Sequence, residues 1–218
     1  MSRIDNISKR SKEQILNRLK NAYNADDFTR TPSIDPVEHI VKNADKLADM
    51  KQKMSDNKYI VDECLDGDLE SKINEIVAKY GFSKMIYGEG LGLDLDKINA
   101  KEKVLFNKEI ENLRSEVFHS DFSVIRAKCG VSSHGVALVL SSPKQPRMLS
   151  LAPTLCIILL DKTQIVGSLA EALNLVKKEN EILPNNVLFI AGPSRTADIE
   201  LITVFGVHGS QIVHLVLY

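Results

Sequence analysis

The first part of the chain has hydrophobic residues at helical spacing. In SKEQILNRLKNAYN, apolar side chains recur at Ile15, Leu16 and Leu19, and the leading Ser is a candidate N-cap. A second helical segment, DPVEHIVKNADKLADMKQKM, opens with Asp-Pro, which suits a helix start. Its apolar stripe consists of Val37, Ile40, Val41, Ala44, Leu47 and Met50. Both segments are expected to form helices, and the second stripe is expected to face a core.

The segment between these helices has a different pattern. Residues 24–35, NADDFTRTPSID, have no apolar period and contain Pro32. We therefore expect an N-terminal helix and linker over 1–35, followed by one folded domain over 36–218.

Beyond about residue 58, short apolar runs alternate with helical segments. The runs are KYIVDE, SKMIYG, GVALVLSS, TLCIILLD, NNVLFIAG and the C-terminal QIVHLVLY. Helical spacing is clearest in DLESKINEIVAKYG, which Gly81 closes, and in GSLAEALNLVKKEN. NKEIENLRSEVF also has a helical pattern, whereas SVIRAKCG fits a helix or a strand. This alternation predicts an α/β fold with a largely parallel central sheet, and the nearly uninterrupted apolar runs predict a sheet covered on both faces.

Composition narrows the class of protein. The 218 residues are 44% hydrophobic and carry a formal net charge of −1, which is typical of a globular protein. Without a basic excess, nucleic acid is not an expected partner. The apolar runs are shorter than a membrane span needs, and the polar start MSRIDNISKRSKEQ has no signal-peptide pattern, so we expect no membrane span and a cytoplasmic location.

The three cysteines, Cys64, Cys129 and Cys156, lie far apart in the sequence and form no CxxC or Cys/His cluster. Local spacing therefore predicts no metal site and no iron–sulfur cluster in this chain. The stretch GEGLGL at 88–93 has Leu93 where the dinucleotide-binding motif GxGxxG has its third glycine. It also lacks the following helix of that motif, so we expect a loop there.

The segment AGPSRTADIELITVFGVHG, residues 191–209, concentrates polar groups after an apolar run. Gly192 and Pro193 predict a sharp turn, and Ser194 or Thr196 could cap a following helix. Asp198 and Glu200 would then lie in its first turns. The stripe of that helix would consist of Ala197, Leu201, Val204 and Phe205, with Gly206 after its end and His208-Gly209 in the next turn.

Arg195 is the residue that capping and turns do not explain, because a cation is unfavourable near a helix N-terminus. In open α/β sheets ligands collect at the carboxyl ends of strands, so Arg195 with exposed N–H groups would suit a carboxylate or phosphate. The alternative is a structural role in which Arg195 pairs with Asp198 or Glu200. Ser194 and His208 lack the GxSxG context of a hydrolase nucleophile.

A second polar segment, Ser132-Ser133-His134-Gly135, precedes the strand VALVL. It reads either as a polar turn with positive φ at Gly135, or as a turn whose Ser133 and His134 line the same cleft as residues 192–200. The other histidines, among them His214, have no partner at a recognisable spacing.

The C-terminal part of the chain resembles a known family. LFIAGPSRTADIELITVFGVHGSQIVHLVLY is similar to the ending of the lactate utilisation protein C (LutC/YkgG-like) group of the LUD domain family, and the resemblance extends over about 125–218. The family commonly has Ala-Glu-Thr-Gly where this chain has Ser132 to Gly135, so its acidic residue is missing at Ser133. If that carboxylate acts in relatives, the difference predicts another ligand or a lost activity.

The resemblance implies a three-layer α/β sandwich of the NagB/RpiA/CoA-transferase-like group, with N-terminal helices added. It also implies a non-redox subunit or accessory protein of an iron–sulfur system that oxidises L-lactate to pyruvate, with the clusters in partner subunits, no cofactor in this chain and a cleft for a small anionic metabolite. The alternative is a stand-alone CoA-transferase-like or cyclo-ligase-like enzyme acting on an acyl or phosphorylated ligand. The expected ligand-binding residues are Gly192, Pro193, Ser194, Arg195, Thr196, Asp198, Glu200, His208, Gly209, Ser133, His134 and Gly135.

Overall fold

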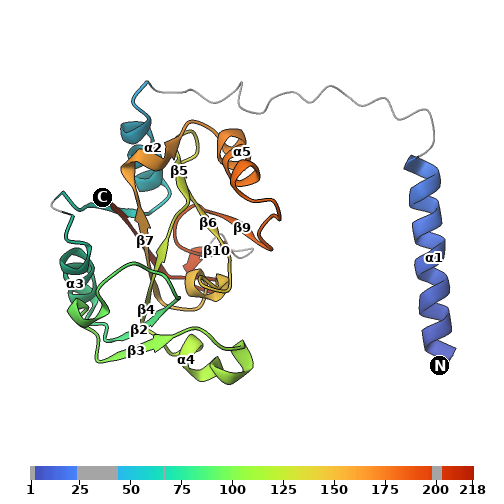
Figure 1. Cartoon of the computed structure of the whole chain (residues 1–218), viewed down its shortest axis with the longest axis horizontal. Coiled ribbons are helices and arrows are strands. Elements are labelled where there is room, and N and C mark those ends of the chain that lie inside the picture. Colours follow the sequence, from blue (N-terminus) through green and yellow to red (C-terminus); the bar gives the residue numbers. More distant parts are fainter. Residues whose placement is uncertain (1–2, 24–43, 66, 198–202) are drawn as a thin grey trace. The chain divides into compact units, whose positions relative to one another are not determined.

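The computed structural model describes residues 3–23, 44–65, 67–197 and 203–218 (Figure 1). The chain divides into two units, Met1–His39 and Ile40–Tyr218. The described part of the first unit is helix α1, Arg3–Tyr23, which confirms the first expected helix. The expected linker at 24–35 lies outside the described residues.

The second unit is built on a six-stranded sheet in which every neighbouring pair is parallel, in the order β1-β12-β7-β4-β2-β3. The strands are β1 (Ile60–Glu63), β2 (Lys84–Tyr87), β3 (Glu102–Leu105), β4 (Phe122–Arg126), β7 (Leu155–Leu160) and β12 (Ile212–Leu217). All six residues of β7 are buried. The predicted α/β fold with a parallel central sheet is confirmed.

A second, four-stranded sheet packs on the first, in the order β8-β5-β6-β9. Its strands are β5 (Cys129–Val131), β6 (Val136–Leu140), β8 (Ile165–Val166) and β9 (Val187–Ile190). Strand β6 runs antiparallel to both β5 and β9. This second sheet was not predicted from the sequence. Residues 132–135 are a connection too short for a parallel crossover, which needs a dozen or more residues, but long enough for a hairpin.

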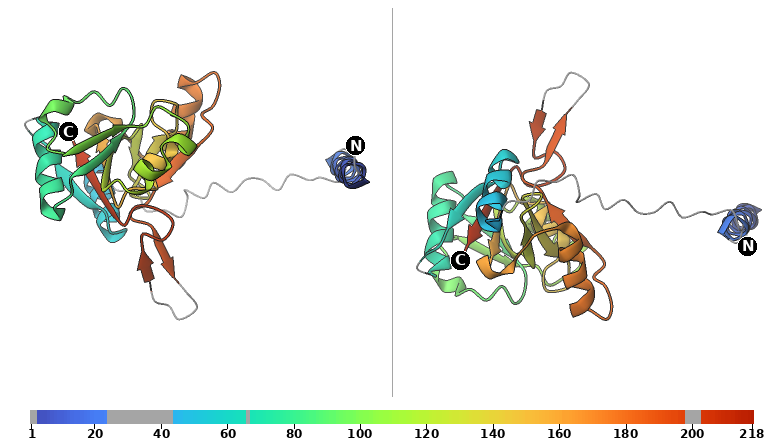
Figure 2. Two further views of the ribbon diagram at one scale, coloured as in Figure 1. Left: turned by 90° about the horizontal axis from the view of Figure 1, so that it is seen from below. Right: turned by 90° about the horizontal axis from the view of Figure 1, so that it is seen from above.

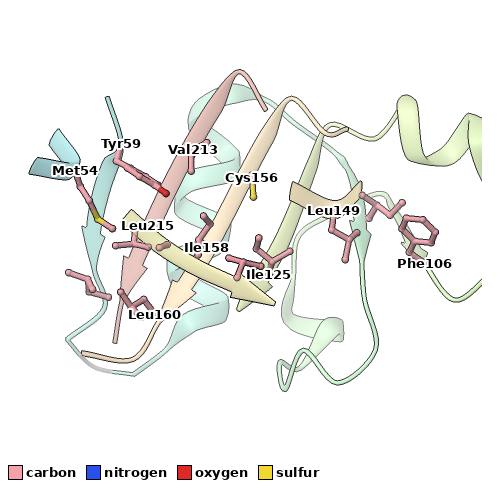
Figure 3. Close-up of a cluster of buried hydrophobic side chains, with 14 of the residues drawn as sticks. Met54, Tyr59, Phe106, Ile125, Leu149, Cys156, Ile158, Leu160, Val213 and Leu215 are labelled. Atoms are coloured by element: carbon pink, nitrogen blue, oxygen red, sulfur yellow. The ribbon is translucent and has the colours of Figure 1, made fainter. Parts of the chain in front are cut away.

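The core follows the alternation of side chains along the strands. In β7, Leu155, Ile157 and Leu159 face one buried cluster, which includes residues of α3 (Leu69–Tyr80). Cys156, Ile158 and Leu160 face another cluster, which includes residues of β6 and of α2 (Lys46–Asp56) (Figure 3). The opposite face of the second sheet packs on α5 (Leu169–Glu179). Helices α3 and α5 therefore lie on opposite outer sides of the two sheets (Figure 1).

Local sequence accounts for most helix ends. Gly81 closes α3 in the left-handed conformation, as expected, and the Ser168 side chain caps α5. Helix α2 begins later than expected, because the Asp45 side chain accepts hydrogen bonds from the next backbone N–H groups and caps it there. The first part of its expected stripe, through Val41, lies outside the described residues.

The described ranges also contain four short 3₁₀ turns and one short helix. The helical pattern of NKEIENLRSEVF forms a 3₁₀ turn and the short helix α4 (Arg114–Phe118). The 3₁₀ turns are η2 (Leu95–Lys97), η3 (Ile110–Asn112), η4 (Arg147–Ser150) and η5 (Lys162–Gln164). Every helix in the described ranges is too short or too polar to span a bilayer.

The expected helix after Pro193 is wrong. Residues Arg195–Ala197 and Thr203–Phe205 form an antiparallel two-stranded hairpin, β10 and β11, that extends away from the sheets (Figure 2). Thr, Val and Phe at 203–205 favour a strand. Gly206, with φ +85°, therefore follows a strand rather than a helix.

Candidate functional site

Ser194 ties the base of the hairpin together. Its backbone N–H donates to the carbonyl of Ser210 at 2.9 Å, and its own carbonyl accepts from the Gly206 N–H at 3.0 Å. Its hydroxyl oxygen accepts from the backbone N–H of His208 at 3.3 Å. The expected role of Ser194 as a helix cap is therefore replaced by a role in closing the hairpin, and its hydroxyl meets the main chain of His208.

Gly192 allows the chain to pass very close to the end of α2. Its φ is +113°, and a Cβ added there would lie 2.2 Å from the backbone oxygen of Asn57. Only glycine fits such an approach without moving the main chain. Next to it, the Tyr59 hydroxyl donates to the carbonyl of Ile190 at 2.7 Å, which fixes the end of β9.

The turn at residues 132–135 reaches the same end of α2. Gly135 has φ +59°, and a Cβ there would lie 2.7 Å from the backbone nitrogen of Met54. The side-chain amide of Asn57 donates to the carbonyl of His134 at 3.5 Å. Asn57, which the sequence analysis did not single out, therefore touches both predicted segments.

The side chains of this turn bond with each other. Ser133 Oγ lies 2.7 Å from Nδ1 of His134, and Ser133 is buried. The two polar segments are therefore neighbours through Asn57, and the hydroxyl of Ser133 is engaged by the adjacent His134 ring. Ligand binding by Ser133, His134 and Gly135 stays a prediction.

A cavity of about 270 Å³ opens beside the hairpin base. Four of the expected residues line it, namely Gly192, Ser194, His208 and Gly209. The other walls come from η4, β7, β9, β12 and the residues next to them. They are Ser150, Leu151, Cys156, Leu188, Phe189, Ile190, Ala191, Ser210 and Val213. We call this space the hairpin-base cavity. Of the other expected residues that the structure describes, Pro193, Arg195, Thr196 and the 133–135 turn do not line it, and Asp198 and Glu200 lie outside the described residues.

The described lining of the hairpin-base cavity contains no Asp, Glu, Lys or Arg side chain. Burial raises the pKa of the Cys156 thiol to about 12, so that this thiol stays protonated at neutral pH. Burial also raises the pKa of Tyr59, whose protonated hydroxyl donates to the carbonyl of Ile190. The cavity can hold a small polar group, but its described lining provides no Lys or Arg side chain for an anion.

Arg195 lies elsewhere than predicted. It is exposed in β10, where it pairs with Phe205 of β11. The strand before it, β9, belongs to the mixed second sheet, so Arg195 is not at the carboxyl end of a strand in the parallel sheet. Its two candidate partners, Asp198 and Glu200, lie outside the described residues. Ligand binding by Arg195 and by Thr196, which is partly buried, stays a prediction.

A buried row of three hydrogen-bonded side chains was not predicted from the sequence. His214 in β12 is 1% exposed, and its Nδ1 lies 2.6 Å from a carboxylate oxygen of Asp62 in β1. Its Nε2 lies 2.8 Å from the hydroxyl of Tyr80 in α3. Since an ionised carboxylate only accepts, Nδ1 donates to Asp62. The sequence signal was a lone His inside the apolar run IVHLVL, but its partners come from elements far away in the chain.

Within the described ranges, no group of three or more His, Cys, Asp or Glu side chains is arranged to hold a metal ion. All three cysteines are buried.

The chain is similar to proteins of one family. The sequence profile of the LUD domain matches residues 47–218. A protein of Neisseria meningitidis serogroup B is 36% identical over a stretch that covers 50% of this chain and 48% of the relative. YkgG of Escherichia coli is 37% identical over 50% of this chain and 49% of its own length. The chain thus spans about half the length of these two curated relatives.

A third relative bears a functional name. Lactate utilization protein C of Halalkalibacterium halodurans is 29% identical over 65% of each chain. Among solved structures, a DUF162 family protein from Deinococcus radiodurans superimposes with a TM-score of 0.58, covering 81% of this chain and 98% of that one at 15% identity. This last similarity supports the fold alone.

Proposed function

Because the chain belongs to the LUD domain family, we propose that it acts in lactate utilization, as a non-redox subunit or accessory protein of an iron–sulfur system that oxidises L-lactate to pyruvate. The observation that carries the proposal is the family match over residues 47–218, together with several relatives that are named lactate utilization protein C. The proposal includes a cytoplasmic location.

The state of the cysteines supports a non-redox role. Iron–sulfur clusters are held by cysteine thiolates. Cys64, Cys129 and Cys156 are each buried in the core, and burial raises the pKa of Cys129 to about 11 and that of Cys156 to about 12. Thiols in this state are poor cluster ligands, so we assign the electron-transfer centres to partner subunits.

The hairpin offers a surface for such a partner. Val204, Phe205 and Val207 are 49%, 39% and 51% exposed, although aliphatic and aromatic side chains usually pack inside. They lie on the segment that extends from the body of the unit (Figure 2). Exposed apolar side chains beside an arginine are a composition that protein interfaces favour. We propose that this hairpin contacts an iron–sulfur subunit, and that the hairpin-base cavity admits a small metabolite.

Complex formation tests this assignment. The purified chain is titrated with the two iron–sulfur proteins of L-lactate oxidation from the same organism, and binding is measured by calorimetry. Phe205→Ser should weaken binding roughly tenfold or more, as truncation of a central aromatic residue commonly does. Leu173→Ser is the matched control, because Leu173 on α5 is exposed to a similar extent, 43%, but lies on another element. Failure of the wild-type chain to bind either protein would contradict the proposal.

Arg195→Ala gives a second test. It should lower lactate-dependent electron transfer by the assembled system without changing the urea unfolding curve of the chain. Arg114→Ala in α4, which removes another exposed arginine, should leave the rate unchanged. Equal rates for wild type and Arg195→Ala would remove Arg195 from the proposed site.

A further inference from the structure

A larger cavity, of about 450 Å³, opens at the carboxyl ends of β2 and β4. Gly88 directly follows β2, and Arg126 is the last residue of β4. The lining consists of Gly88, Glu89, Gly90, Leu91, Val124, Arg126, Leu140, Ser141, Ser142, Lys144, Gln145, Asn180 and Pro184. We call this space the strand-end cavity. Among the described residues, it shares no lining residue with the hairpin-base cavity. In open α/β sheets the carboxyl ends of the strands are where ligands bind.

Glycine shapes one wall of the strand-end cavity. A Cβ on Gly88 would lie 2.1 Å from the backbone oxygen of Lys144, so only glycine lets the turn at residues 142–145 approach the end of β2. That turn is held by two backbone hydrogen bonds between Ser142 and Gln145. The Gln145 side chain bonds both the N–H and the carbonyl of Arg126. The turn at 142–145 is therefore held both by its own backbone hydrogen bonds and by those of Gln145 to the end of β4.

Two cations lie against the loop at residues 88–92. A Cβ on Gly90 would lie 3.9 Å from Cδ of Lys144, and a Cβ on Gly92 would lie 3.3 Å from Nη2 of Arg126. The long side chain of Lys144 and the guanidinium of Arg126 thus meet one short loop, which places both at one cavity.

Neither cation is neutralised by a carboxylate of the described residues. Arg126 donates from Nε to the carbonyl of Leu91 at 2.6 Å, from Nη1 to the hydroxyl of Tyr218 at 2.7 Å and from Nη2 to the carbonyl of Gly92 at 3.5 Å, which are uncharged acceptors. Lys144 and Arg126 have no described carboxylate oxygen within 4.0 Å, in contrast to the ion pairs elsewhere, such as Lys53 with Asp49 at 2.7 Å. Glu89 also lines the cavity, so the lining carries two positive charges and one negative charge.

We propose that the strand-end cavity binds a small organic anion, with its carboxylate or phosphate group at Lys144 and Arg126. Charge-assisted hydrogen bonds to an oxyanion would use the donors of Lys144 and the remaining donors of Arg126. The apolar body of the ligand would lie against Leu91, Leu140 and Pro184. The cavity has the size of a small-molecule site. This site goes beyond the proposed function, which does not depend on it.

A neighbouring cavity gives the ligand body more room. This space of about 540 Å³ shares Ser141, Ser142, Asn180 and Pro184 with the strand-end cavity, and Ile182 and Leu183 add apolar walls. An anion with an apolar chain should therefore bind more tightly than the bare oxyanion.

The test is an NMR titration of the ¹⁵N-labelled full chain at constant ionic strength. The probes are inorganic phosphate, n-hexyl phosphate and hexanoate, and the readout is the amide signals of Gly88, Gly90 and Gly92. We expect saturable shifts at these glycines, with n-hexyl phosphate binding more tightly than inorganic phosphate. A response to hexanoate alone or to the phosphates alone identifies the preferred oxyanion.

Lys144→Met is the decisive variant, since Lys144 is exposed and its ammonium has no described partner to lose on substitution. It should weaken binding of the probes roughly tenfold, in line with the loss of one hydrogen bond to a charged group. Lys101→Met is the matched control, because Lys101 is exposed at the opposite, amino end of β3, and it should bind like wild type.

Two results would overturn the proposal: no saturable shift at the three glycines with any probe, or equal affinities for wild type and Lys144→Met. Saturable shifts at residues 192–209 alone would also overturn it, by placing the anion at the hairpin base. The titration uses the chain without partners, so a negative result does not affect the calorimetric binding test with the iron–sulfur proteins. A negative result in that binding test likewise does not affect the titration.

Discussion

The hairpin-base cavity and the strand-end cavity differ in how the sequence encodes them. The first takes only part of its lining from the segment dense in polar residues, where those groups close the hairpin, and its described lining contains no Lys or Arg. The second is assembled from the end of β4 and the segments after β2, β6 and α5, which lie far apart in the sequence, and it carries Arg126 and Lys144. The dense polar segment therefore forms a closed hairpin base. Arg126 and Lys144, in contrast, lie at one cavity because the sheet topology brings distant segments of the chain together.

The largest effect in this comparison is expected from Gly192→Ala. The added Cβ would lie 2.2 Å from the backbone oxygen of Asn57 at a residue with φ +113°. We expect a loss of about 3 kcal/mol in the free energy of unfolding, from steric overlap and backbone strain together. Urea unfolding followed by circular dichroism measures it.

Gly81→Ala is the control that separates the cost of backbone strain at positive φ from the cost of steric overlap with a neighbouring atom. Gly81 has φ +67°, but a Cβ there would meet no atom within 4 Å. It should cost only about 1 kcal/mol. If Gly192→Ala costs no more than Gly81→Ala, the close approach to α2 does not constrain the hairpin base.

Gly88→Ala probes the strand-end cavity in the same way and should have a smaller effect. Its Cβ would lie 2.1 Å from the Lys144 carbonyl oxygen, but Gly88 has no positive φ and the turn at 142–145 can shift. We expect about 2 kcal/mol, from overlap alone. The same variant should also weaken n-hexyl phosphate binding in the NMR titration, because the wall moves. Unchanged affinity at reduced stability would show that this wall does not shape the ligand site.

The smallest signal is expected for the alkylation of Cys156, the thiol that lines the hairpin-base cavity. Burial raises the pKa of Cys156 to about 12, so little thiolate is present at pH 8 and alkylation by iodoacetamide should be very slow. Peptide mass spectrometry after timed labelling checks this, with chain unfolded in urea as the positive control. Rapid labelling of Cys156 in the native chain would mean that the cavity opens and exposes a reactive thiol.

Local patterns were sufficient where one element carries its own signal. The helical spacing and Gly81 gave α3, and the uninterrupted apolar run gave the buried β7. The hairpin was missed because Ala197, Val204 and Phe205 also fit a helical stripe, and strands of three residues are too short to show alternation.

Contacts between distant elements were outside the reach of such patterns. His214 meets Asp62 and Tyr80 only because β1 pairs with β12 and α3 covers them. In the same way, Lys144 meets Gly90 through a turn that belongs to another sheet. The connection to lactate utilization came from the similarity of the C-terminal sequence to a known family. The spacing of apolar and polar residues alone does not indicate it.

The most direct test of the account is an add-back experiment with the two iron–sulfur proteins of L-lactate oxidation. Reduction of an artificial electron acceptor by L-lactate is measured without the chain, with the wild-type chain and with Phe205→Ser. The account predicts a low rate without the chain, a restored rate with wild type and a partial rate with Phe205→Ser. Equal rates with and without the wild-type chain would contradict its role as a subunit of the system.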